Sequence, residues 1–309
     1  MKQTPFSIGK TFGLEGLPEH LTVPGYSERT PFVPALDAHY LFRKDLLSDL
    51  LAWHSLGGSE GLFLTGPTGS GKSTLILQVA ARLNIPVQRV TAHSRLETPE
   101  LVGHYVLDHG SMSFVDGPLT TALRAGHWFL LDEIDLLDPA TAASLNGVIE
   151  GAPLVIPEKG GELVSPAPGF CFIATGNTAG SGDRTGLYQG TLRQNLAFLD
   201  RFWMVQVGYP ERNQELSILN RAVPALPQEL AVKMVSFAEQ VRRLFVAGQI
   251  EVTLSTRTLV RWAKLAEFFR PLNAQGKDPF RHALERALSF RAEPESQSAL
   301  AEIAQRIFG

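Results

Sequence analysis

The stretch GLFLTGPTGSGKST, residues 61–74, contains an apolar run, a glycine-rich loop and a lysine followed by two hydroxyl residues. A buried strand, then G-x-x-x-x-G-K-S, then a helix is the P-loop arrangement, in which backbone N–H groups converge on phosphate oxygens. The residues expected around the phosphate are Gly66, Pro67, Thr68, Gly69, Ser70, Gly71, Lys72, Ser73 and Thr74. A glycine-rich turn without a ligand is the alternative, but the strand and helix patterns on either side favour the P-loop.

The last residues of this motif suit a nucleotide that is bound together with magnesium. Lys72 would reach the β- and γ-phosphates, and the Ser73 hydroxyl would bind Mg²⁺. The motif therefore predicts ATP and Mg²⁺ as the bound groups. P-loops contact phosphates, and nothing in the sequence identifies the base, so GTP stays an open alternative to ATP.

A second apolar run, WFLLDEID (128–135), ends in acidic residues. Consecutive acids at the end of a buried strand are costly unless they meet a cation. We expect Asp132 to lie on the metal side, and Glu133 to orient and deprotonate the attacking water. Asp135 is expected to be a solvated acid at the start of a helix, without a catalytic role.

Two further polar residues are candidates for contacts to the γ-phosphate. Asn177 follows the apolar run 170–177 and would emerge at the edge of the sheet where open α/β sheets bind ligands; a turn-forming asparagine is the alternative. Arg257 is expected in the first turn of a helix capped by Ser255 or Thr256, where a cation opposes the helix dipole. A bound phosphate would offset that cost, and a solvated arginine is the alternative.

Apolar runs alternate with helical patterns through the first two thirds of the chain. The expected strands cover residues 61–66, 86–92, 128–134, 170–177 and 202–209. Helices are expected between them, for example over 72–83 and over 139–151, where Asp138 would be the N-cap. This alternation predicts an α/β fold with a mainly parallel sheet.

Other segments depart from the alternation and suggest the domain organisation. Residues 104–117 and 153–166 each contain a turn between extended halves and predict two inserted β-hairpins. Residues 1–35 are rich in proline, glycine and threonine and predict an extended N-terminal arm. We expect the nucleotide-binding domain over 36–210, and a smaller helical domain over 211–309.

Composition excludes several broad classes of protein. A formal charge of −3 gives no general attraction to nucleic acid or to an anionic membrane. No apolar run approaches the ~18 residues of a membrane span, and no secretory signal is evident, so we expect a cytoplasmic protein. The single cysteine, Cys171, reads as a core residue of a strand rather than a reactive thiol. The spacing of His93, His104 and His109 fits no compact metal motif.

Taken in this order, these residues resemble those of AAA+ ATPases. The two hairpins narrow the resemblance to the clade of MoxR-like proteins and chelatase motor subunits, nearest to the ATPase subunits of aerobic cobaltochelatases. The resemblance covers nearly the whole chain and is carried by the segments TFGLEG, TVPGYSE, DAHYLF, QVAARLNIP, LVGHYV and ATGNTAGSGDRTGLYQGTLRQNLAFLDRF. The last of these, which ends at Phe202, is the most specific.

The resemblance implies a five-stranded sheet with a helical lid, and a ring of identical subunits, expected to be a hexamer, in which neighbours share each ATP. Arg201 is then the arginine finger that enters the site of the adjacent subunit. An intramolecular pair with Asp200, or a surface arginine, is the alternative. Arg257 matches the lid arginine, which would report the nucleotide state.

The resemblance also implies a partner, namely a protein with a von Willebrand A-type domain or a chelatase-type subunit. The P-loop interior PTGS and the insert DHGSMSFVDGPL depart from the cobaltochelatase pattern, which leaves the remodelled substrate open. A motor that moves along nucleic acid is an alternative, although Asp108 and Asp116 make the first hairpin a poor surface for phosphates. A nucleotide-gated scaffold with slow hydrolysis is another.

Overall fold

The computed structural model describes residues 2–56, 60–108, 110–183, 186, 188–276 and 278–309. The chain divides into two units. The first contains residues 1–38, 42–66 and 72–207, and the second contains residues 39–41, 67–71 and 208–309. Each unit is described by itself below.

A parallel five-stranded sheet forms the centre of the first unit, with strand order β11-β3-β10-β7-β4. Its strands are β3 (Gly61–Thr65), β4 (Val87–Thr91), β7 (Trp128–Asp132), β10 (Cys171–Gly176) and β11 (Phe202–Gln206). The five expected strands and their parallel pairing are thus confirmed, and each ends one to three residues earlier than the pattern suggested. Because all strands run the same way, their carboxyl ends lie at one edge.

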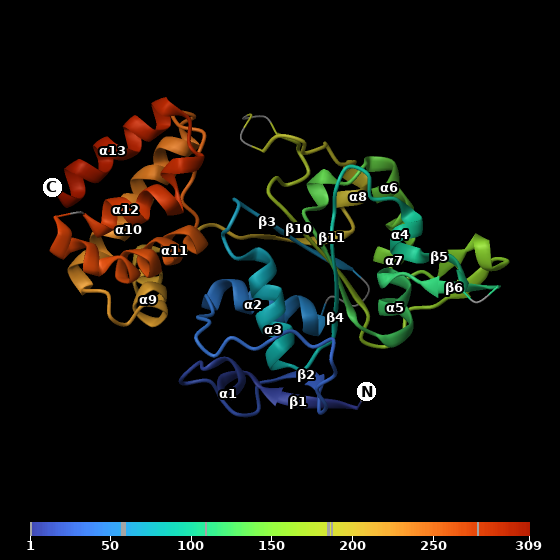
Figure 1. Cartoon of the computed structure of the whole chain (residues 1–309). Coiled ribbons are helices and arrows are strands. Elements are labelled where there is room, and N and C mark those ends of the chain that lie inside the picture. The colour runs from blue at the N-terminus through green and yellow to red at the C-terminus, as the bar shows by residue number, and fades with distance from the viewer. Residues whose placement is uncertain (1, 57–59, 109, 184–185, 187, 277) are drawn as a thin grey trace. The chain divides into compact units, whose positions relative to one another are not determined.

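Successive residues of each strand point to opposite faces of the sheet, and each face is covered. Leu62, Leu64 and Leu130 share one buried cluster with α2 (Lys44–Leu56) and α3 (Lys72–Arg82). In Figure 1 these two helices and the N-terminal strands lie on one side of the sheet.

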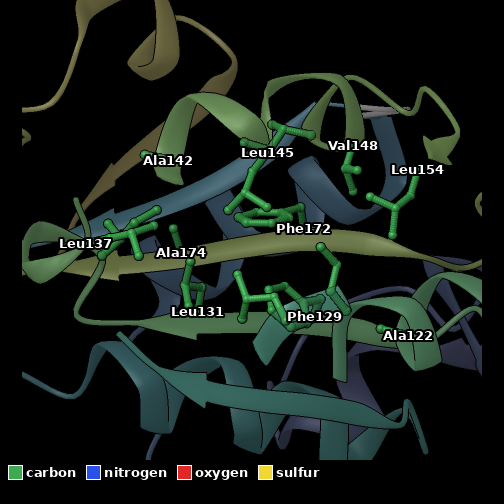
Figure 2. Close-up of a cluster of buried hydrophobic side chains, with 14 of the residues drawn as sticks. Ala122, Phe129, Leu131, Leu137, Ala142, Leu145, Val148, Leu154, Phe172 and Ala174 are labelled. Atoms are coloured by element: carbon green, nitrogen blue, oxygen red, sulfur yellow. The ribbon is translucent and has the colours of Figure 1, made fainter. Parts of the chain in front are cut away.

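The opposite face of the sheet packs against short helices and the second hairpin. Phe129 and Phe172, on neighbouring strands, lie beneath Leu145, Val148 and Leu154 (Figure 2). The covering elements are α4 (Thr98–Val102), α5 (Pro118–Ala125), η1 (Ile134–Leu136), α6 (Pro139–Ser144), α7 (Asn146–Ile149) and α8 (Leu196–Leu199). The helix expected over 139–151 is two helices, and Asp138 caps the first by accepting a hydrogen bond from the Ala140 N–H.

Both expected hairpins are present. The first pairs β5 (Gly103–Asp108) with β6 (Ser111–Asp116), and His109 at its turn lies outside the described residues. The second pairs β8 (Leu154–Ile156) with β9 (Glu162–Val164), joined through η2 (Pro157–Lys159). Both hairpins pair antiparallel, as expected.

The N-terminal segment differs from the expected extended arm. β1 (Gln3–Ser7) pairs antiparallel with β2 (Thr22–Tyr26), and α1 (Ile8–Phe12) follows β1. Phe12, Val23 and Tyr26 are buried in the same cluster as α2 and α3. Proline and glycine gave the segment its extended appearance, but burial of these three side chains folds it onto the first unit.

Helices make up most of the second unit. They are α9 (Arg212–Ala222), α10 (Gln228–Val246), α11 (Thr256–Phe268), η3 (Arg270–Gln275), α12 (Pro279–Ala287), η4 (Ser289–Arg291) and α13 (Pro294–Phe308). Edge-to-face contacts join Phe237, Trp262 and Phe308 in its core. Among the residues that the structure describes, no helix is long and apolar enough to cross a membrane.

Candidate nucleotide site

The carboxylate of Asp132, at the end of β7, accepts hydrogen bonds from three sides. Oδ1 accepts from the Ser73 hydroxyl at 2.5 Å and from the Thr175 hydroxyl at 2.8 Å. Oδ2 pairs with Nε of Arg89 on the edge strand β4, also at 2.5 Å. Asp132 is buried, whereas about half of the Arg89 side chain is exposed (49%). A carboxylate oxygen beside a serine hydroxyl is the donor set that Mg²⁺ takes in P-loop sites.

Lys72, at the start of α3, points into the same edge of the sheet. Its ammonium group donates to the Gly66 carbonyl at 2.6 Å and to Oδ1 of Asn177 at 3.0 Å. Burial lowers the pKa of Lys72 to about 8, against the opposing effect of Asp135, Asp132 and Glu133. Lys72 and Asn177, 105 positions apart, therefore lie at the same edge of the sheet.

Asp135 corrects one expectation, because it is buried rather than solvated. Its Oδ2 accepts from the backbone N–H groups of Asn177 and of Thr178, the latter at 2.9 Å. Burial raises the pKa of Asp135, although both of these bonds act to lower it. Asp135 thus fixes the backbone that carries Asn177, which is a positioning role.

Glu133 stands exposed at the end of the strand in a left-handed conformation, with φ of 58°. This conformation is uncommon outside glycine and costs of order 1 kcal/mol. The Glu133 N–H donates to the Thr175 hydroxyl at 3.2 Å, and that hydroxyl in turn donates to Asp132. Thr175 therefore holds the two acids in a fixed relation, with Asp132 turned inward and Glu133 outward.

Two glycines of the P-loop allow close approaches that a side chain would block. At Gly66, with φ of 147°, an added Cβ would lie 2.1 Å from the Val207 carbonyl oxygen. In the second unit, a Cβ on Gly69 would lie 2.3 Å from Cβ of Ser255. Ser255 is the N-cap of α11 and accepts from the Thr258 N–H. Helix α11, with Arg257 in its first turn as expected, thus begins beside the loop.

The residues present fit a nucleotide phosphate with Mg²⁺. The Ser70 hydroxyl is buried, and it has no hydrogen-bond partner among the residues that the structure describes. A buried donor of this kind is costly unless a ligand satisfies it. With the cation of Lys72 and the oxygens of Ser73 and Asp132, this part of the chain offers donors for an anion and ligands for a hard cation.

Arg201, which directly precedes β11, is paired within its own chain. Its Nε lies 3.0 Å from Oε1 of Glu150, and its guanidinium also donates to the Ala197 carbonyl. The partner is thus Glu150 rather than Asp200. The Glu150 side chain is more than half exposed (55%) and the Arg201 side chain is 24% exposed, so solvent weakens this pair.

Sequence reasoning did not assign three residues to the site, namely Arg89, Thr175 and Asp135. The only signal for Arg89 in the sequence was a charge in the middle of a strand pattern, and on an edge strand such a charge can also stay in water. Thr175 lies two residues before Asn177 and could have been placed on the same edge. Their partners are far away in the chain, so the sequence alone did not pair them.

Outside this edge the structure offers little other chemistry. Cys171 packs against the core, and burial raises the pKa of its thiol to about 12, so the reactive thiolate is scarce. No group of three or more histidine, cysteine or acidic side chains in the described part of the chain could hold a metal ion. His109 lies outside that part.

The parallel sheet, the P-loop and the acids of β7 define the class of P-loop nucleoside triphosphatases. Residues 61–202 match the family model "AAA domain (dynein-related subfamily)". Residues 215–307 match the model "CbbQ/NirQ/NorQ C-terminal". Together the two models cover four of the five strands of the sheet, the first residue of β11 and nearly all of the C-terminal helices.

Two curated relatives match over most of their length. The aerobic cobaltochelatase subunit CobS of Sinorhizobium sp is 32% identical, over 100% of this chain and 92% of the relative. Protein NorQ of Paracoccus denitrificans is 30% identical, over 80% of this chain and 86% of the relative. The chain therefore belongs to the AAA+ ATPases, in the MoxR-like family that includes CobS and NorQ. It is an ATP-hydrolysing enzyme.

Solved structures confirm the fold independently of sequence. A mutant of Thermotoga maritima RuvB superposes with a TM-score of 0.51 at 16% identity, covering 78% of this chain and 68% of that one. The α/β fold and the AAA+ class are thus those that the sequence predicted.

Proposed function

We propose that this chain forms a ring, expected to be a hexamer, that couples Mg²⁺-dependent ATP hydrolysis to the remodelling of a partner protein. The convergence of Lys72, Ser73, Asp132 and Asn177 at one edge of the sheet carries this proposal, because these residues can contact the phosphates and the metal ion, and Glu133 next to Asp132 can act as the base.

ATP is the substrate, and Mg²⁺ would neutralise charge on its phosphates. The P-loop N–H groups and Lys72 would bind the phosphates, while Ser73 and Asp132 would hold the metal ion. Glu133, exposed at the strand end, accepts the proton of the attacking water. The Asn177 amide, which accepts a hydrogen bond from Lys72, would contact the γ-phosphate and orient that water.

Arg201 and Arg257 complete the site as cations. Arg201 would leave its weak pair with Glu150 and stabilise the transferring phosphoryl group in the neighbouring subunit. Arg257, at the start of α11, would contact the phosphates of its own subunit and report their state to the helical unit. This sharing of one ATP between subunits makes hydrolysis depend on assembly.

The hairpins favour a protein partner over nucleic acid. Their exposed side chains include Leu107, Met112, Val155 and Leu163, which are apolar and suit a protein surface. Arg124, beside them, is already paired with Asp116 and Glu162. Similarity to CobS suggests a chelatase-type partner or a protein with a von Willebrand A-type domain.

Complementation between two inactive variants would test the shared site. Glu133→Gln lacks the base and Arg201→Ala lacks the finger, so each alone should lose at least ~100-fold in kcat. A mixed ring contains sites that combine Glu133 of one subunit with Arg201 of its neighbour, and these sites should recover activity. We would measure ATPase activity of each variant and of the mixture, and the mass of each assembly by light scattering.

Three results would contradict the proposal. If mixed rings form but stay inactive, Arg201 acts within its own chain and the site is not shared. If Glu133→Gln hydrolyses ATP at the wild-type rate, the base is misassigned. Specific activity that is constant from monomer to assembly would exclude the ring as the active form.

A further inference from the structure

Tyr209, three residues after β11, connects the part of the P-loop that belongs to the second unit (residues 67–71, the phosphate loop below) to the helices of that unit. Its hydroxyl donates to the backbone carbonyl of Thr68 at 3.0 Å and lies 3.4 Å from the Thr253 hydroxyl. All three residues belong to the second unit. Burial raises the pKa of Tyr209, so its hydroxyl keeps its proton and remains a donor at neutral pH.

The bond to Thr68 determines where the next N–H group points. A trans peptide is planar, and the C=O of one residue is antiparallel to the N–H of the next. Holding the Thr68 carbonyl therefore aims the Gly69 N–H to the opposite side of the loop. Gly69 has φ of 69° and no side chain, so without this bond its backbone would sample many conformations.

A buried ion pair holds the ring of Tyr209 in place. The Arg242 guanidinium lies over this ring, 4.1 Å from its centre. Arg242 also forms two parallel bonds to Glu215, of 2.7 and 2.8 Å, and donates from Nε to the Leu254 carbonyl at 2.8 Å. A guanidinium with these partners is fixed in one orientation.

The same pair reaches the start of α11. The Thr256 hydroxyl donates to Oε1 of Glu215 at 2.7 Å, and Thr256 is the residue before Arg257. Ser255, the N-cap of this helix, packs directly on Gly69. A closed chain of contacts thus runs from the phosphate loop through Tyr209, Arg242 and Glu215 to α11 and back to the loop.

We propose that Tyr209 is a positioning residue for nucleotide binding, which orients the Gly69 N–H toward the phosphates and ties the phosphate loop to the helix that carries Arg257. The loop is thereby organised before the nucleotide arrives, which reduces the conformational entropy lost on binding. The inference rests on the P-loop as nucleotide site, and it assigns a role to a residue outside every motif recognised in the sequence.

The test compares two variants that each lose one phenol hydroxyl. Tyr209→Phe keeps the ring over Arg242 and removes the bond to Thr68, together with the longer contact to the Thr253 hydroxyl. Tyr105→Phe is the matched control, because the Tyr105 hydroxyl also donates to a backbone carbonyl at 3.0 Å, that of Glu158 between the hairpin strands. We would measure the Kd for ADP with Mg²⁺ by calorimetry and the Tm of each full-length variant.

Tyr209→Phe should raise the Kd for ADP by about fivefold, the value of one neutral hydrogen bond, while Tyr105→Phe leaves it unchanged. Wild-type binding tests the nucleotide site itself, and the difference between variants tests Tyr209 alone. An unchanged Kd in Tyr209→Phe would overturn the proposal, whatever happens to the Tm.

Hydrogen exchange gives a second readout that stability alone does not control. In nucleotide-free Tyr209→Phe, the amides of residues 69–73 should exchange faster than in wild type, with amides of α10 unchanged. Uniformly faster exchange in both segments would mean that Tyr209 only stabilises the helical unit, and would count against the proposal.

Discussion

Each unit of this protein contains a buried carboxylate paired with an arginine, and the two pairs are built differently. We call a pair closed when both side chains are buried and open when one of them is exposed. The Glu215–Arg242 pair in the second unit is closed: 10% of the Arg242 side chain is exposed, and it binds Glu215 through two hydrogen bonds. The Asp132–Arg89 pair in the first unit is open: the Arg89 side chain is 49% exposed and binds one carboxylate oxygen, while the Ser73 and Thr175 hydroxyls bind the other.

The difference separates a structural ion pair from a binding site. A closed pair loses most when one partner is removed, because the other is left buried and uncompensated. An open pair keeps one partner in water, where its charge is solvated at little cost. A site that must accept a metal ion therefore needs the open form, and a network that must keep one geometry needs the closed form.

Equivalent substitutions in the two pairs should differ most in stability. Glu215→Gln leaves Arg242 buried without its counter-charge, and we expect the free energy of unfolding of the second unit to fall by about 3–5 kcal/mol. Urea denaturation followed by circular dichroism measures this change. Glu239→Gln removes the partner of the more exposed Arg212 and serves as control, with an expected loss of about 1 kcal/mol or less.

Asp132→Asn should have a small effect on stability and a large effect on ligand binding. We expect the free energy of unfolding to change by about 1 kcal/mol or less, because Arg89 stays solvated. Affinity for ADP in the presence of Mg²⁺ should fall on the order of 100-fold through loss of the metal ligand. The same titration in EDTA should show little difference from wild type. An equal loss with and without Mg²⁺ would place Asp132 on the nucleotide rather than on the metal.

Lys72 makes the open site sensitive to pH. Its pKa of about 8 means that the charge that attracts phosphate is present below pH 8 and lost above it. Nucleotide affinity should therefore decline by up to about tenfold per pH unit above 8. The stability of the nucleotide-free protein changes in the opposite direction, rising between the folded pKa and the ordinary value of 10.5, because the unfolded chain binds more protons there.

The pH profile is checked by calorimetry between pH 7 and 9.5, with Lys72→Met as the control that lacks the titrating group. The decline should disappear in this variant. If Lys72→Met shows the same decline as wild type, another group titrates and the pKa of Lys72 is not what controls binding.

Arg89→Met should have the smallest effect. The free energy of unfolding should change by less than about 1 kcal/mol, since Arg89 is half exposed. Removing a cation that competes for Oδ2 of Asp132 should lower the Mg²⁺ concentration for half-maximal ATPase activity by about two- to threefold. A large loss of stability would show that this pair is closed in solution, and would erase the contrast with Glu215.

Most of the fold could be predicted from the sequence, because the patterns that indicate strands and helices are local. The apolar runs around residues 61–66 and 128–134 gave the strands, and Asp138 before Pro139 gave the start of α6. The fold of the N-terminal segment could not be predicted in this way, because Phe12 and Val23 pack against helices that follow later in the chain. Local composition cannot report such contacts.

The sequence by itself determined the class of protein, since the P-loop, the acids after β7 and Asn177 are recognisable from spacing alone. Only the tertiary structure decided how these and other residues are paired. Arg89 pairs with Asp132 and Glu150 with Arg201, Asp135 accepts from the backbone next to Asn177, and Tyr209 donates to the P-loop. A motif can be recognised in the sequence because its residues are close together in the chain. The pairing of a charge or a hydroxyl is set by the three-dimensional packing of distant segments.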